Sequence, residues 1–156
     1  MIGISMTNKK TTYTSSHSLL PKAVLDTHVF LWLMQGDKRL SSKSAELINK
    51  YGRDNALYLP AICLWEVALL DKRKRIKLHQ PCSQWLHEAI NKPGLLVMPL
   101  SLDIALESVA LPDNFHNDPA DRLIVATARV LNAKLITRDS KILEYAEAGF
   151  IQCIEV

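Results

Sequence analysis

The sequence predicts an α/β fold in which helices cover both faces of a central parallel sheet. Two patterns indicate this arrangement. Short apolar segments of strand length alternate with longer helical segments along the chain. The strand segments are almost continuously apolar, as is typical of strands buried on both faces. The 156 residues contain no repeat and no linker, so we expect one domain of ordinary size with a real core.

The expected strands are short apolar runs bounded by turn residues or by aspartate. They cover residues 23–25, 56–59, 95–100, 134–139 and 150–156. The expected helices lie between them. They cover residues 29–34, 41–48, 60–70, 84–90, 101–111, a segment that starts at 119, and 141–147.

The stretch from His116 to Ala128 has the pattern of a helix start. Asp118 is a good N-cap because its carboxylate can accept from free N–H groups of the first turn. Pro119 suits the first helical position, where a missing N–H group is harmless. Asp121 follows three residues after the cap, so both carboxylates lie on one face. Capping and favourable interaction with the helix dipole would by themselves explain both residues, so a structural role stays open.

Other acidic residues occur where proteins with a parallel sheet usually have their ligand-binding or active site. Asp26 and Asp139 each end a predicted strand, and ligands of open parallel sheets bind beyond the carboxyl ends of the strands. Asp26 also suits a helix N-cap. Glu66 is the only charge in an otherwise apolar helix that we expect to be largely buried. It either points outward along a narrow exposed stripe or needs a partner, because burying a bare carboxylate is unfavourable.

Carboxylates that converge raise one another's pKa unless a cation lies between them. Mg²⁺ and Mn²⁺ prefer oxygen ligands, and the chain has no His/Cys spacing typical of zinc. It also lacks GxxxxGK[ST], GxGxxG and GxSxG motifs, which argues against nucleotide-triphosphate, dinucleotide and serine-hydrolase sites. Metal-assisted hydrolysis of a phosphodiester is therefore the reaction class that these residues favour.

Composition sets further limits. The formal net charge of +3 permits a polyanionic partner without requiring one. The dense basic run from Lys72 to Lys77 would suit either phosphate contact or a solvated helix end. Three scattered cysteines, no membrane-spanning apolar run and no secretion signal predict a cytoplasmic protein. Residues 1–21 are polar and aperiodic, and we expect a flexible extension there.

The chain from Ala23 to Val156 resembles a PIN-domain ribonuclease, most closely the VapC-type toxin of a type II toxin–antitoxin pair. Four motifs in order carry the resemblance: Val24-Leu25-Asp26-Thr27-His28, Leu64-Trp65-Glu66-Val67-Ala68, Asp118-Pro119-Ala120-Asp121-Arg122-Leu123-Ile124, and Leu135-Ile136-Thr137-Arg138-Asp139. Each motif alone is weak, and together they are specific.

The resemblance implies a PIN-like three-layer sandwich over residues 22–156 that acts as an endoribonuclease dependent on Mg²⁺ or Mn²⁺. The catalytic, metal-binding residues it implies are Asp26, Glu66, Asp121 and Asp139, with Thr27, Asp118 and Thr137 in supporting positions. It also implies an RNA substrate, a homodimer, and inhibition by a cognate antitoxin protein.

Two alternatives remain. A PIN-like module could bind RNA or a protein without cutting, although such a module has no reason to keep the four carboxylates. An aspartyl-phosphate hydrolase could use Asp26 as its nucleophile, but His28 stands where such enzymes usually carry a second Asp.

Overall fold

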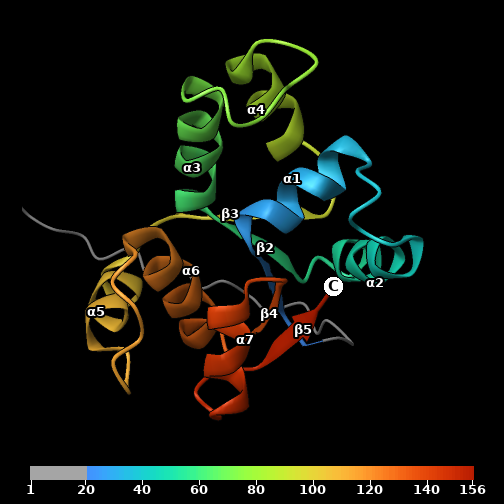
Figure 1. Ribbon diagram of the computed structural model, residues 1–156. Coiled ribbons are helices and arrows are strands. Elements are labelled where there is room, and N and C mark those ends of the chain that lie inside the picture. Colours follow the sequence, from blue (N-terminus) through green and yellow to red (C-terminus); the bar gives the residue numbers. More distant parts are fainter. Residues whose placement is uncertain (1–20) are drawn as a thin grey trace, which may run out of the picture.

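The computed structural model describes residues 21–156, so the extension expected at residues 1–21 lies outside the described residues apart from Pro21. Strands and helices alternate as expected (Figure 1). The strands are β1 (Ala23–Leu25), β2 (Leu57–Pro60), β3 (Leu95–Met98), β4 (Lys134–Thr137) and β5 (Cys153–Glu155). The helices are α1 (Thr27–Gln35), α2 (Ser42–Arg53), α3 (Ala61–Lys72), α4 (Cys82–Ile90), α5 (Leu102–Ala110), α6 (Pro119–Val130) and α7 (Ser140–Glu147).

The five strands form one parallel sheet in the order β3-β2-β1-β4-β5, which confirms the predicted sheet. The first strand is the central one: Ala23 of β1 pairs with Leu57 of β2 and with Lys134 of β4. From β1 the chain builds the sheet outward to β2 and β3, then returns to the other side of β1 for β4 and β5. The carboxyl ends of β1 and β4 therefore lie at a topological switch point, where parallel sheets usually bind ligands.

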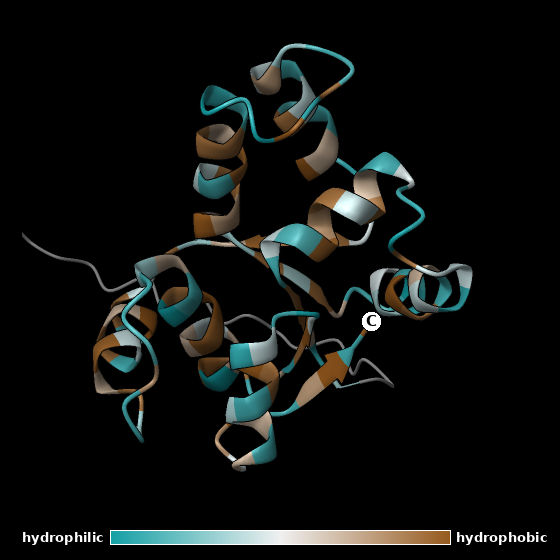
Figure 2. Cartoon of the chain, in the orientation of Figure 1, coloured by the Kyte–Doolittle hydropathy of each residue, from teal (hydrophilic) through white to brown (hydrophobic). Residues whose placement is uncertain are grey.

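The helices form the two outer layers of the sandwich. Right-handed crossovers in opposite directions along the sheet place α1 to α4 on one face and α5 to α7 on the other, as Figure 1 shows. The strands between them are mostly hydrophobic (Figure 2). All of β1 is buried, and Leu135 and Ile136 of β4 are inaccessible to solvent, so the middle of the sheet is the core.

Several element bounds differ from the sequence-based expectation. The last strand is confined to Cys153–Glu155, shorter than the expected 150–156. Helix α2 continues through Gly52 to Arg53, whereas the helix predicted from the pattern at residues 41–48 was expected to end before Gly52. The backbone of Gly94 approaches this end of the helix closely, and glycine is needed at position 94: its φ is +85°, and a Cβ atom there would lie 2.3 Å from the Gly52 carbonyl oxygen.

The expectation that the apolar helix after β2 is largely buried was wrong. In α3 the buried residues are Cys63 and Val67, whereas Trp65 is 57 % exposed. The helix packs against α1, α4 and α6 through part of its circumference and leaves another apolar side uncovered. No helix within residues 21–156 is both long enough and apolar enough to cross a membrane.

Candidate active site

The carboxyl ends of β1 and β4 carry the first part of the candidate site. Asp26 directly follows β1 and is the N-cap of α1, where its Oδ1 accepts from the Thr27 N–H at 2.6 Å. Its Oδ2 accepts from the Thr137 hydroxyl of β4 at 2.6 Å. Asp26 is 6 % exposed, and burial raises its pKa despite these two hydrogen bonds. Both oxygens are thus held in fixed positions at the switch point.

Helix α3 adds Glu66 to the same place. The Thr27 hydroxyl donates to Glu66 Oε1 at 2.5 Å, which joins the first turn of α1 to the middle of α3. Burial raises the pKa of Glu66, and the negative charges of Asp26 and Asp118 raise it further. Glu66 therefore points inward to Thr27. It does not point outward along an exposed stripe, which was the other possibility left by the sequence.

The amino-terminal end of α6 supplies Asp118 and Asp121. Asp118 is the N-cap, as predicted, and its Oδ1 accepts from the N–H groups of Ala120 and Asp121 at 3.0 and 3.1 Å. The Asp121 carboxylate accepts no hydrogen bond from residues 21–156. Its pKa is raised to about 7, first by burial and then by the charges of Asp118, Asp26, Asp139 and Glu66. With this pKa, Asp121 changes protonation near neutral pH.

Asp139 lies two residues beyond β4 and caps α7. Its Oδ1 accepts from the N–H groups of Lys141 and Ile142, and its own N–H donates to the Thr137 hydroxyl at 2.9 Å. Asp139 is close enough to raise the pKa of both Asp26 and Asp121. Thr137 thus links Asp26 and Asp139 through one hydroxyl group.

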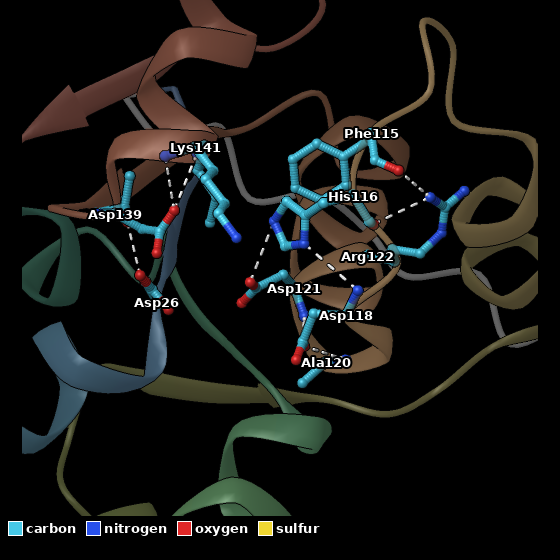
Figure 3. A network of polar contacts seen from close by, with 11 residues as sticks. Asp26, Phe115, His116, Asp118, Ala120, Asp121, Arg122, Asp139 and Lys141 are labelled. Atoms are coloured by element: carbon cyan, nitrogen blue, oxygen red, sulfur yellow. Dashed lines mark hydrogen bonds and ion pairs between the residues drawn. The ribbon is translucent and has the colours of Figure 1, made fainter.

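We call Asp26, Glu66, Asp118, Asp121 and Asp139 the acidic cluster. The structure brings all of them to one end of the sheet. The predicted Thr27 bonds Asp26 and Glu66, and the predicted Thr137 bonds Asp26 and Asp139. Figure 3 shows Asp26, Asp118, Asp121 and Asp139 around this end of the sheet.

Sequence reasoning did not single out His116, which faces Asp121 from the loop before α6 (Figure 3). Its Nε2 lies 3.3 Å from Oδ2 of Asp121, and it is buried without a hydrogen-bond partner among residues 21–156. Its Nδ1 accepts from the Asp118 N–H at 3.4 Å, which places the proton of the neutral ring on Nε2. The sequence offers one indication of this role: His116 lies two residues before the N-cap Asp118, where its ring can contact the Asp118 backbone.

Arg122 holds the loop that carries His116. Its guanidinium donates to the backbone carbonyls of Ser108, Phe115, His116 and Val109, at distances from 2.6 to 3.3 Å. The sequence left open whether Arg122 contacts RNA. These bonds occupy the guanidinium within the fold and fix the loop against α6.

The acidic cluster fits a hard divalent cation in its donor chemistry. Every member offers carboxylate oxygens, the ligands that Mg²⁺ and Mn²⁺ prefer, and the crowded charges raise pKa values as uncompensated carboxylates do. Within residues 21–156, no three Asp, Glu, His or Cys side chains already stand close enough to hold an ion. The acidic cluster therefore suits a divalent cation by its carboxylate donors and by the repulsion between their charges. It does not form a completed coordination shell.

The fold and the acidic cluster together define a class of α/β proteins with a carboxylate-lined site at the switch point of a parallel sheet. The family model for the PIN domain matches residues 23–148, and the chain belongs to the PIN-domain family.

Among curated proteins, the chain is similar to Ribonuclease VapC22 of Mycobacterium tuberculosis. The two are 34% identical over 119 residues, which cover 76% of this chain and 88% of that protein.

Solved structures show the same fold. VapBC2 from Rickettsia felis, bound to a DNA fragment from the promoter, matches with a TM-score of 0.62 and 15% identity, over 85% of this chain and 97% of that chain. A toxin–antitoxin complex from Klebsiella pneumoniae matches with a TM-score of 0.55 and 25% identity, over 77% and 88% of the two chains.

Proposed function

We propose that this protein is a metal-dependent endoribonuclease and the toxin of a toxin–antitoxin pair. The observation that carries the proposal is the acidic cluster, in which carboxylates from separate elements meet at the switch point of a PIN fold. The similarity to Ribonuclease VapC22 supports RNA as the substrate.

The proposed ligands of Mg²⁺ or Mn²⁺ are Asp26, Glu66, Asp121 and Asp139. When bound, such an ion lowers the pKa of water and offsets the charge that develops on phosphate. Thr137 and Thr27 keep the Asp26 and Glu66 oxygens in place through their hydroxyl groups. In the metal-free protein Asp121 has a pKa of about 7, so the ion should bind more tightly above that pH, where the Asp121 carboxylate has lost its proton.

The test is RNA cleavage by purified protein freed of any antitoxin, with and without Mg²⁺ or Mn²⁺, beside an Asp26→Asn variant. We expect discrete cuts that require the ion, and a loss of roughly a hundred- to a thousandfold in the variant. RNA binding without cutting in both ions would instead favour a non-catalytic PIN module.

A homodimer is part of this proposal, and the exposed apolar side of α5 supports it. Leu102, Leu106 and Val109 lie at helical spacing on that helix and are 73%, 61% and 81% exposed. Light scattering should report a dimer for the native chain and a monomer for Leu106→Glu, with Leu47→Glu on α2 as the control. A monomeric native chain would contradict the proposed homodimer.

The second proposed partner is an antitoxin protein, supported by the toxin–antitoxin complexes among the structural neighbours. Co-expression with the protein encoded beside this chain should yield a stable complex in which RNA cleavage is suppressed.

A further inference from the structure

A basic cavity lies next to the acidic cluster, between α1 and the segment that follows α3. It has a volume of about 510 Å³, and its lining includes His28, Trp32, Arg39, Arg75 and Lys77. This is within the size range of small-molecule and cofactor sites. Part of the basic run therefore forms one wall of a cavity and does not simply surround a helix end.

Packing and one hydrogen bond hold the segment after α3 in place, with its basic side chains along the cavity. Ile76 and Leu78 pack against the core, whereas Arg75 and Lys77, which alternate with them, are exposed. The Gln35 side chain at the end of α1 donates to the Lys77 carbonyl at 2.9 Å, which ties the segment to α1. In Figure 2 the chain just beyond α3 is hydrophilic.

The charges of the cavity are available to an anion. Its one lining carboxylate, Asp37, is bonded by the Arg39 guanidinium at 3.0 and 2.6 Å. Within residues 21–156, the Arg75 guanidinium and the Lys77 ammonium form no ion pair with a carboxylate. Two cations therefore remain without a counter-charge in the same hollow.

His28 connects this cavity to the acidic cluster. It lines the cavity and follows Asp26 by two residues, in the first turn of α1. Burial raises the pKa of Asp26 and of Glu66, and the charge of His28 partly opposes both increases. His28 therefore lies near both carboxylates. The Thr27–Glu66 bond joins α1 to α3 at the cluster, and both helices also line the cavity, through Trp32 of α1 and Leu70 of α3.

We propose that this cavity binds a backbone phosphate of the RNA strand on one side of the bond that is cut, through Arg75 and Lys77. The inference rests on the proposed nuclease function, which it deepens. A strand that enters the acidic cluster meets repulsion from the carboxylates, and a fixed cationic contact farther along the backbone, toward the end of α1, offsets it. Phosphate contacts of this kind position a strand without reading its sequence.

The test compares two double variants that remove the same charge from the same basic run. Arg75→Ala with Lys77→Ala removes the cations of the cavity. Lys72→Ala with Arg73→Ala removes two exposed cations that do not line it. Both pairs are placed in the Asp26→Asn background, and binding of a fluorescein-labelled single-stranded oligoribonucleotide is followed by fluorescence anisotropy from about 50 to 200 mM KCl.

We expect the cavity pair to weaken RNA binding by about tenfold and to lower the slope of log affinity against log salt by about 1.4, or about 0.7 for each lost contact. The control pair should leave the slope unchanged. In the otherwise native chain, the cavity pair should raise KM for cleavage and leave kcat unchanged. Equal effects of the two pairs, or no effect of either, would overturn the proposal.

The two proposals fail in distinguishable ways. If the native protein cuts no RNA but the cavity pair still loses affinity selectively, the nuclease proposal is wrong and the cavity remains an RNA site. If the native protein cuts RNA and the cavity pair binds it normally, the cavity proposal is wrong. Weaker binding of the antitoxin with unchanged binding of RNA would also overturn it, and would assign the cavity to the protein partner.

Discussion

The acidic cluster has a sheet side and a helix side, and the two are held in different ways. On the sheet side, Asp26 has a hydrogen bond on each oxygen, and the Thr137 hydroxyl joins it to Asp139. On the helix side, no residue in the described part of the chain donates a hydrogen bond to the Asp121 carboxylate, which faces the buried Nε2 of His116. The sheet side provides fixed geometry, whereas the helix side provides a group whose charge can change.

One site can therefore obtain its fixed geometry from the strand ends and a group that changes charge from the start of a helix. Strand ends are held by the register of the sheet, so Thr137 and Asp26 are placed by the pairing of Leu25 with Ile136. The start of α6 depends on a loop, which Arg122 fixes through backbone carbonyls. The predictions below alter one side while leaving the other intact.

The largest effect is expected on the sheet side, from Thr137→Val. Valine has nearly the same shape, but Oδ2 of the buried Asp26 carboxylate loses its donor, and the pKa of Asp26 rises further. We expect the free energy of unfolding to fall by about 1.5–3 kcal/mol, and RNA cleavage to fall roughly ten- to a hundredfold. Urea unfolding and a cleavage assay measure the two effects.

Thr127→Val is the matched control for that change. Thr127 is also buried, but its hydroxyl donates to the Leu123 carbonyl inside α6, away from the carboxylates. Its cleavage rate should stay at the native level. If both variants lose cleavage to the same degree, the Thr137 hydroxyl has no specific role in holding Asp26.

On the helix side, His116→Ala should loosen Asp121 and leave the fold intact. We expect Mn²⁺ to bind about tenfold more weakly, as when a group that orients a ligand is removed. Titration calorimetry measures this directly, without RNA. His116→Gln, whose amide can also donate, should recover part of the affinity. Native Mn²⁺ affinity in His116→Ala would show that this contact is incidental.

The pH dependence of stability should report Asp121 in metal-free protein. Its pKa is raised from 3.8 to about 7, so the folded state binds more protons than the unfolded state between these values. The free energy of unfolding should therefore decrease as pH rises through this window, and Tm with it. Asp121→Asn should reduce this decrease, measured by thermal unfolding with a chelator present. An unchanged slope in Asp121→Asn would place the titration elsewhere.

The smallest effect is expected from Asp118→Ala. The first turn of α6 loses its cap, at a cost of about 1 kcal/mol in the free energy of unfolding. The pKa of Asp121 should fall as well, because the charge of Asp118 helps to raise it. Urea unfolding and the pH profile measure these changes. Ser101→Ala, which removes the cap of α5, is the control that should alter stability alone.

Local signals in the sequence were enough to predict the sheet and much of the acidic cluster. Asp118 and Pro119 mark the start of α6 through capping chemistry, which depends on neighbours in the sequence. The parallel sheet followed from the alternation of strands and helices. Asp26 and Asp139 were found because each follows a predicted strand, and parallel strands bring their carboxyl ends together.

Other features depend on contacts that no local pattern contains. The composition of α3 predicted burial, yet Trp65 is exposed because burial depends on what packs against each side of a helix. The bond between Thr27 and Glu66 joins distant segments. The place of His116 depends on the loop that Arg122 fixes, and the cavity at Arg75 and Lys77 depends on where α1 lies beside them.

The bond between Thr137 and Asp26 joins residues 111 positions apart, and β4 completes the centre of the sheet beside β1. During translation, β1 leaves the ribosome long before its partner in this bond has been made. A nascent chain that ends before β4 has Asp26 but neither Thr137 nor Asp139. The proposed cleavage of RNA can therefore begin only after β4 and Asp139 have left the ribosome and joined β1.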